Sequence, residues 1–109
     1  MDIHVYILRC QDGSYYTGLT RAGLETRIGQ HNSGTFPGYT FKRRPVELLW
    51  SQEFSVLTDA IAVERQIKGW NRAKKEALIA EDWETLCLLS HRGKANALLR
   101  NLRLAKTSS

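Results

Sequence analysis

The sequence predicts an α+β fold: a three-stranded, mostly antiparallel sheet flanked by helices, in the order β-β-α-β-α-α, with a C-terminal helical extension. Three observations lead to this prediction. Short β-rich runs flank an Asp-Gly turn, later segments carry apolar residues at helical spacing, and the length allows one core. With 109 residues, 42% of them hydrophobic, the chain is too short for two well-formed cores.

A β-hairpin is predicted at the start of the chain. The runs Ile3–Arg9 and Tyr15–Leu19 are rich in β-branched and aromatic residues. They flank the sequence Gln11-Asp12-Gly13-Ser14, which is typical of a hairpin turn.

The length of this turn decides where Tyr6 and Tyr16 point. A two-residue loop would place them on opposite faces of the sheet, because strand side chains alternate. A three-residue loop with Gly13 in the left-handed conformation would instead pair Tyr6 with Gly18 and place both phenols on one face. A shared chemical role for the two tyrosines therefore requires the three-residue loop.

A helix and a third strand follow the hairpin. Thr20 is a suitable cap for a helix running roughly from Ala22 to Asn32, and Gly34 is a suitable left-handed stop. After a loop rich in Gly, Thr and Pro, the β-forming run Val46–Trp50 is expected to be the third strand.

The second half of the chain is expected to be helical. Apolar residues at helical spacing predict one helix from about Thr58 and another from Arg72 to about Ala80. Residues 83–104 are expected to form a further amphipathic helical segment. We therefore expect one domain over residues 1–80 and a basic helical extension over residues 81–109.

The net charge of +5 is unevenly distributed along the chain. All 11 acidic residues lie at or before Glu84, with 11 of the 16 basic ones, so the excess charge lies in the residues after Glu84. Local clusters are more informative, and there are two: Lys42, Arg43 and Arg44; and Arg65, Lys68, Arg72, Lys74 and Lys75. Each cluster is either a solvated face or a track for phosphate groups.

Several classes of protein are disfavoured. Cys10 and Cys87 are far apart and belong to no ligand-spaced pair, so we expect two packed thiols and neither a disulfide framework nor a zinc site. No apolar run approaches the ~20 residues of a membrane span, and the N-terminus lacks the pattern of a signal peptide. A cytoplasmic location without a membrane partner is expected.

Three polar residues lie in or beside predicted apolar faces. Arg27 and His31 are one helical turn apart and border the apolar stripe of their helix, either as a polar flank or as a functional pair. Glu64 falls inside the apolar stripe of its own helix, where an unpaired carboxylate would be costly. We expect it either to form a salt bridge with Arg27 or Lys68, or to bind a metal ion.

Five segments, taken in order, resemble the GIY-YIG nuclease superfamily: HVYILRC, YYTGLT, RIGQHNSG, YTFKRRPVELLW and DAIAVERQIKGWNRAKKEALI. The resemblance is close to the small standalone members of the superfamily and covers roughly residues 3–80. It implies a metal-dependent phosphodiesterase fold, which homing endonucleases, some restriction enzymes and the incision subunit of excision repair share. DNA repair is the process that this last relative suggests.

The resemblance also implies a set of catalytic residues. It assigns catalytic roles to Tyr6, Tyr16, Arg27 and Glu64, with Glu64 as the metal ligand, and His31 matches a position that the family fills with His or Tyr. Arg27 would meet charge on the phosphate with paired donors. Mg²⁺ or Mn²⁺ is the expected cofactor, because Mg²⁺ keeps most of its waters and needs few protein ligands.

The tyrosines and the histidine would handle the attacking water. A phenol titrates near pH ~10, so Tyr6 accepts a proton from water only if Arg27 and the cation favour its phenolate. Tyr16 would hydrogen-bond the nucleophile or the phosphate, and His31 would orient the attacking water or relay its proton. The first motif, His4-Val5-Tyr6, lacks the family's leading glycine, and Leu19 stands where many relatives have a lysine. These departures put the efficiency of cleavage in question more than catalysis itself, since every residue with a central catalytic role is present.

Three functions compete at this point. The leading expectation is a divalent-metal-dependent endonuclease acting on DNA, with RNA as the alternative substrate and with low sequence specificity. The second is a weakly catalytic or non-catalytic nucleic-acid-binding module that uses Lys42, Arg43, Arg44, Lys68, Arg72, Lys74 and Lys75. The third is a protein-interaction adaptor acting through the C-terminal leucines. The complete tyrosine, arginine and glutamate set favours the enzyme, because a pure binder needs no carboxylate in its phosphate site.

Overall fold

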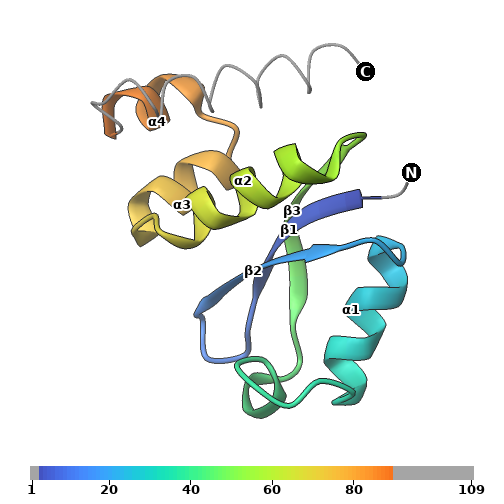
Figure 1. The fold of residues 1–109 in the computed structure, drawn as a ribbon. Helices are drawn as coiled ribbons and strands as arrows, with labels where there is room; N and C mark the ends of the chain where they lie inside the picture. Colours follow the sequence, from blue (N-terminus) through green and yellow to red (C-terminus); the bar gives the residue numbers. More distant parts are fainter. Residues whose placement is uncertain (1–2, 90–109) are drawn as a thin grey trace. The chain divides into compact units, whose positions relative to one another are not determined.

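A computed structural model of the chain describes residues 3–89 (Figure 1). Its strands are β1 (Ile3–Arg9), β2 (Tyr15–Thr20) and β3 (Glu47–Phe54). Its helices are α1 (Leu24–Ser33), α2 (Leu57–Lys68), α3 (Arg72–Ile79) and α4 (Trp83–Leu89), with a short 3₁₀ helix, η1 (Phe41–Arg43). The element order β-β-α-β-α-α-α confirms the predicted α+β fold.

The chain divides into two compact units, Met1–Lys68 and Gly69–Ser109. The first holds the sheet, α1 and α2. In the second, α3 begins after Asn71, whose side chain accepts a hydrogen bond from the Lys74 backbone at 2.9 Å. The predicted division into residues 1–80 and 81–109 stays a prediction, and residues 90–104 of the predicted helical segment lie outside the described residues.

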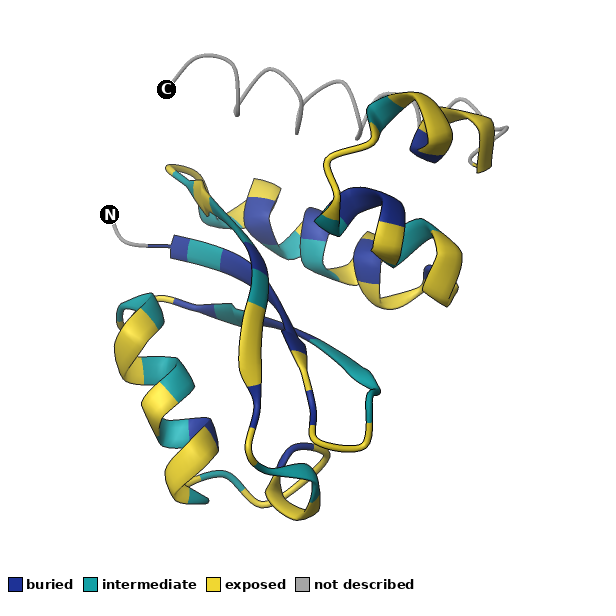
Figure 2. Ribbon diagram, turned by 180° about the vertical axis from the view of Figure 1, so that it is seen from behind, coloured by how far each residue is buried: buried dark blue, intermediate teal, exposed yellow. Residues whose placement is uncertain are grey.

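The sheet has the strand order β2-β1-β3, and both pairings are antiparallel. Because β1 is the central strand, both of its faces are covered, and Figure 2 shows it buried along most of its length. This explains why the apolar run of β1 is nearly continuous rather than alternating. The hydrophobic cluster on the Tyr6 face contains Tyr6, Leu8, Cys10 and Val46, with Tyr16, Leu24 and Ile28 packed against it.

The hairpin loop has three residues, the length that a shared role of the two tyrosines requires. The Cys10 N–H donates to the Ser14 carbonyl at 2.8 Å, and the Gly13 N–H donates to the Cys10 carbonyl at 2.9 Å. Gly13 has φ of 84°, in the left-handed region. The register therefore pairs Tyr6 with Gly18, and the two phenols share one face, which confirms the parity argument.

The ends of α1 differ in how well they were predicted. Gly34 ends the helix in the left-handed conformation, with φ of 78°, as expected. The expectation that Thr20 caps the helix is wrong, because α1 begins at Leu24 and Gly23 occupies the cap position. The Thr20 hydroxyl instead accepts a hydrogen bond from the Ala22 backbone at 3.1 Å and stabilises the preceding turn.

Two further expectations need correction. The third strand continues to Phe54 because Ser51, Gln52 and Glu53 pair with β1, and this ladder outweighs their modest β propensity. Cys10 is buried, but Cys87 is exposed on α4, since it follows the inward-facing Leu86 by one helical step. None of the helices within residues 3–89 combines the length and the apolar character needed to cross a membrane.

Candidate active site

Tyr6 and Tyr16 lie side by side on the face of the sheet that α1 covers. Tyr6 is 1% exposed, and the centroids of the two rings are 6.4 Å apart. The close approach of Tyr6 to β2 depends on Gly18, because a Cβ at that position would lie 2.4 Å from Oη of Tyr6. The glycine in the second motif thus makes room for the buried phenol.

His31 joins this pair from the last turn of α1. Its Nε2 lies 2.9 Å from Oη of Tyr6, and its Nδ1 lies 2.9 Å from the hydroxyl of Thr40, which is also buried. With the proton on Nδ1, His31 donates to Thr40 and accepts from Tyr6. The His31 ring also contacts Tyr16 edge-on, with centroids 5.2 Å apart. A chain of hydrogen bonds therefore connects the strand, the helix and the loop.

Arg27 lies one helical turn before His31 and is half-buried. Its guanidinium lies over the ring of Phe36, at 4.8 Å from the centroid. Its Nε is buried without a hydrogen-bond partner, and within residues 3–89 the side chain forms no ion pair. Because a buried donor without a partner is costly, this geometry suits an anion supplied from outside the chain.

Glu64 comes from α2, which packs against β2 and β1. Its side chain is 16% exposed, and Oε2 receives the ammonium of Lys68 at 2.8 Å. Of the two predicted salt-bridge partners, the structure therefore shows Lys68 rather than Arg27. The Glu64 hydrogen bond is the main cause that raises the pKa of Lys68, while the Glu64 charge also raises the pKa of Tyr6. The carboxylate is thus electrostatically coupled to the tyrosine.

The pKa shifts of Tyr6 and His31 determine which of the two side chains carries a proton at neutral pH. Burial raises the pKa of Tyr6 well above its ordinary value, Tyr16 and Glu64 add to this, and Arg27 opposes it without prevailing. Burial, followed by the charge of Arg27, lowers the pKa of His31. At neutral pH the pair therefore consists of a protonated phenol and a neutral imidazole. Arg27 alone therefore does not make Tyr6 a phenolate that could accept a proton from water.

The residues present fit only a loosely held metal ion. Among the described residues, no group of three or more His, Cys, Asp or Glu side chains is arranged to hold a metal. A single, largely buried carboxylate such as Glu64 suits Mg²⁺ or Mn²⁺, which retain most of their waters, and does not suit a chelated Zn²⁺. The exposed ammonium of Lys68 competes for the same carboxylate.

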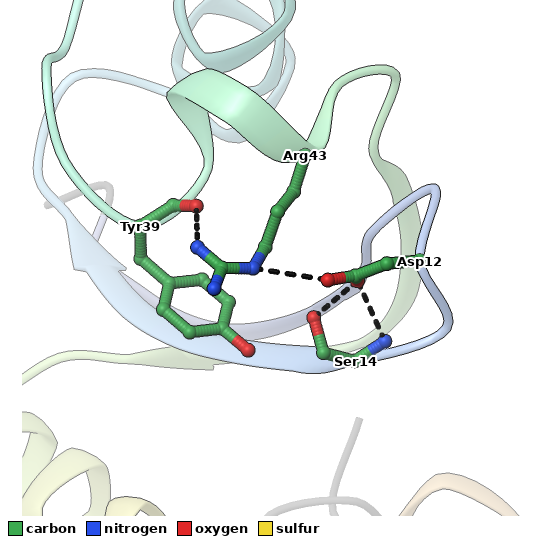
Figure 3. Close-up of polar contacts among 4 residues, drawn as sticks. All are labelled: Asp12, Ser14, Tyr39 and Arg43. Carbon is green, nitrogen blue, oxygen red and sulfur yellow. Dashed lines mark hydrogen bonds and ion pairs between the residues drawn. The ribbon is translucent and has the colours of Figure 1, made fainter.

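Several residues of the two basic clusters already have partners within the chain. Lys42 is exposed, whereas Arg43 and Arg44 bind within the chain: Arg43 donates to Asp12 at 3.0 Å, and Arg44 donates to the Phe41 carbonyl at 2.8 Å (Figure 3 shows the first). The second cluster is divided between the two units: Arg65 and Lys68 belong to the first, and Arg72, Lys74 and Lys75 to the second. Nucleic-acid binding by these residues stays a prediction.

Sequence reasoning missed three residues around the site, Thr40, Phe36 and Tyr39. Thr40 holds His31, Phe36 packs on His31 with centroids 5.4 Å apart, and Tyr39 stacks on Tyr16 at 6.0 Å. All three lie in the loop between α1 and β3, which has no periodic pattern to interpret. The one available signal was that Tyr39 and Thr40 begin a segment of the family resemblance.

A hollow in the first unit is lined by a different set of residues. The turn between β1 and β2 and the start of β3 line it, through Arg9, Cys10, Gln11, Gly13, Pro45, Val46 and Glu47. Arg9 and Glu47 form an ion pair at its edge. None of the five candidate catalytic residues contributes to it.

Comparison with known proteins identifies the family. The GIY-YIG catalytic domain model matches residues 2–77, from before β1 into α3. The chain belongs to the GIY-YIG family. This membership confirms the resemblance and places the chain in a nuclease family. The GIY-YIG match includes Tyr6, Tyr16, Arg27, His31 and Glu64.

The chain is also similar to small UPF0213 proteins. One from Staphylococcus saprophyticus is 44% identical over 82 residues, which cover 74% of this chain and 99% of the relative. Another from Halobacterium salinarum is 43% identical over 75 residues, covering 69% and 96%. The solution NMR structure of a protein from E. faecalis has 37% identity and a TM-score of 0.54, and the match covers 74% of this chain and 85% of that one. These similarities support the GIY-YIG fold over nearly the whole length of the relatives.

Proposed function

We propose that the chain is a divalent-metal-dependent endonuclease that hydrolyses phosphodiester bonds in DNA with low sequence specificity. The observation that carries the proposal is the contact between Tyr6, His31 and Tyr16, with Arg27 close enough to oppose the rise in the pKa of Tyr6 and to contribute to the lowered pKa of His31. This arrangement combines groups that exchange protons with water and a cation that stabilises charge on a phosphate.

Arg27 binds the phosphate in this proposal. Its guanidinium has no carboxylate partner within residues 3–89, and its Nε–H is buried without an acceptor. A phosphate oxygen would satisfy that donor and receive the positive charge. The contact strengthens as negative charge develops on the phosphate oxygens, so it stabilises the transition state more than the bound substrate.

Tyr6 and His31 move the proton. The attacking water gives a proton to Oη of Tyr6, while the phenol proton of Tyr6 passes to Nε2 of His31 across the 2.9 Å hydrogen bond. The phenol is neutral before and after this transfer, so its raised pKa is no obstacle. Thr40 accepts from Nδ1 and thereby holds Nε2 ready as the acceptor. Tyr16 orients the water or the phosphate.

Glu64 holds the cation in this proposal. When bound, Mg²⁺ or Mn²⁺ polarises the phosphate and stabilises the leaving oxygen. Lys68, whose side chain is 51% exposed, releases Glu64 and contacts the DNA backbone instead. Lys42 and the remaining basic residues contribute phosphate contacts that are independent of sequence.

The second candidate function is a nucleic-acid-binding module with weak or no catalysis. One specific observation favours it: the ammonium of Lys68 already neutralises Glu64 at 2.8 Å. A carboxylate with a permanent ammonium partner needs no metal ion.

The test is cleavage of supercoiled plasmid and of branched DNA with Mg²⁺, with Mn²⁺, or with a chelator. We expect nicking only with a metal ion, and we expect Arg27→Ala to reduce it by roughly 10²–10³-fold, as loss of a transition-state donor does. Arg9→Ala is the matched control, since it removes the same charge from an exposed ion pair with Glu47. DNA binding by the wild type without metal-dependent cleavage of either substrate would favour the binding module.

A further inference from the structure

The loop between α1 and β3 contains three aromatic residues that each contact an arginine. The guanidinium of Arg27 lies 4.8 Å from the Phe36 ring centroid, that of Arg43 lies 3.9 Å from Tyr39, and that of Arg44 lies 4.6 Å from Phe41. Proteins have about one such pair per 70–80 residues. Here, three pairs lie between Arg27 and Arg44, and one of them involves a candidate catalytic residue.

Two of these rings are exposed. Tyr39 is 42% exposed and Phe41 is 40% exposed, although both are large and apolar. Each has a cation at its ring, and the exposed ammonium of Lys42 lies between them in the sequence. Aromatic rings interleaved with cations suit a ligand that has both flat apolar surfaces and negative charges.

The Tyr39 ring is held in place by the hairpin turn. Arg43 donates from Nε to Asp12 at 3.0 Å and from Nη1 to the Tyr39 carbonyl at 2.8 Å (Figure 3). Asp12 in turn accepts hydrogen bonds from the backbone and the hydroxyl of Ser14. These contacts fix Arg43 against the ring, so little side-chain freedom remains to be lost when a ligand binds.

The exposed rings continue directly from the candidate active site. The Tyr39 ring stacks on Tyr16, with centroids 6.0 Å apart and an angle of 26° between the planes. Thr40, which separates Tyr39 from Phe41 in the sequence, bonds His31. A nucleotide next to a phosphate bound at Arg27 would therefore lie within reach of this loop.

We propose that Tyr39 and Phe41 stack on unpaired bases of the nucleic-acid strand that the site binds, while the exposed ammonium of Lys42 contacts its phosphates. This inference rests on the proposed function and specifies its substrate class. The bases of a duplex already stack on one another, so their faces are closed to a protein ring. The partner is therefore a single-stranded segment or a site with unpaired bases.

The test measures binding in a chelator, so that no cleavage interferes. Fluorescence anisotropy compares a short single-stranded oligonucleotide with an abasic oligonucleotide of the same length, which keeps the phosphates and lacks the bases. We expect the wild type to bind the first roughly five- to one-hundredfold more tightly. Tyr39→Ala/Phe41→Ala should lose this difference, whereas Tyr39→Phe/Phe41→Tyr should retain it, because both rings remain.

Controls separate stacking from folding and from catalysis. Val56→Ala truncates an exposed apolar side chain outside the loop and should behave as the wild type, and thermal melting checks that each variant is folded. Equal affinity of the wild type for the two oligonucleotides would overturn the stacking proposal, even if plasmid is cleaved. Base-dependent binding that the alanine variant loses, without metal-dependent cleavage, would support stacking and refute the endonuclease.

Discussion

Replacing Gly18 with alanine tests the close packing of β2 against the candidate active site. A Cβ at this position would lie 2.4 Å from Oη and 2.5 Å from Cζ of Tyr6, well inside van der Waals contact. Tyr6 is 1% exposed and bonded to His31, so its ring cannot move aside without losing a buried hydrogen bond. Overpacking costs ~1–3 kcal/mol and an unsatisfied buried polar group ~1–3 kcal/mol. We expect Gly18→Ala to lower the free energy of unfolding by about 2–6 kcal/mol.

Urea denaturation measures this loss, and two comparisons isolate its cause. Gly29→Ala is the matched control in α1, where a new Cβ meets nothing within 4 Å, and we expect it to stabilise the protein by ~0.5–1 kcal/mol. In a Tyr6→Leu background the clashing ring is absent, so Gly18→Ala should cost less than about 1 kcal/mol. An equal cost in both backgrounds, or no cost in the wild type, would refute the packing argument.

Two further predictions concern pH. Because the pKa of Tyr6 is raised on folding, the contribution of Tyr6 to stability is complete below pH ~10 and is lost as the pH rises above that value. In denaturation experiments Tyr6→Phe should not show this alkaline loss of stability. The same loss in Tyr6→Phe would mean that another group causes it. Because the pKa of His31 is lowered, its contribution is present above pH ~6.5 and lost as the pH falls through the lowered value. The rate of DNA cleavage should fall on the same acid side, with an apparent pKa below ~6.5, and this limb should disappear in His31→Gln; an apparent pKa above ~6.5 would contradict the proton transfer to a neutral imidazole.

The hairpin could be predicted because local rules control it, and the same rules reduced the placement of the two tyrosines to a choice between two loop lengths. Gly13 supplies the left-handed residue of a three-residue loop, and the alternation of strand side chains then fixes the relation between Tyr6 and Tyr16. Gly34 likewise ended α1 where expected. In each case the determining residue is adjacent in the sequence to the feature that it sets.

The features that could not be predicted depend on tertiary contacts. β3 continues to Phe54 because its last residues pair with β1, and the β propensity of those residues does not indicate a strand. Thr40 is known as the partner of His31 only once the loop is folded. The choice of Lys68 over Arg27 as the partner of Glu64 was left open, since both lay within reach in the sequence pattern, and the structure selects the neighbour on the same helix.

The proposed endonuclease requires Glu64 to hold a metal ion rather than only its bridge to Lys68. The bridge is an i,i+4 pair whose lysine is 51% exposed and whose carboxylate is 16% exposed, so removal of the ammonium leaves a largely buried carboxylate without its partner. Glu64→Gln and Lys68→Gln both break it, but only the second keeps the carboxylate. They therefore form a matched pair, and thermal melting checks that each variant is folded under the conditions of the cleavage assay.

The most direct test is the rate of metal-dependent cleavage by these two variants, measured at saturating DNA over a titration of Mg²⁺. We expect Glu64→Gln to lose cleavage by orders of magnitude while its DNA affinity holds or rises, because the charge that retains the metal is gone. Lys68→Gln should still cleave and should reach half-maximal rate at a lower Mg²⁺ concentration, because the competing ammonium is absent. Cleavage by Glu64→Gln at the wild-type rate, or equal losses in both variants, would contradict the claim.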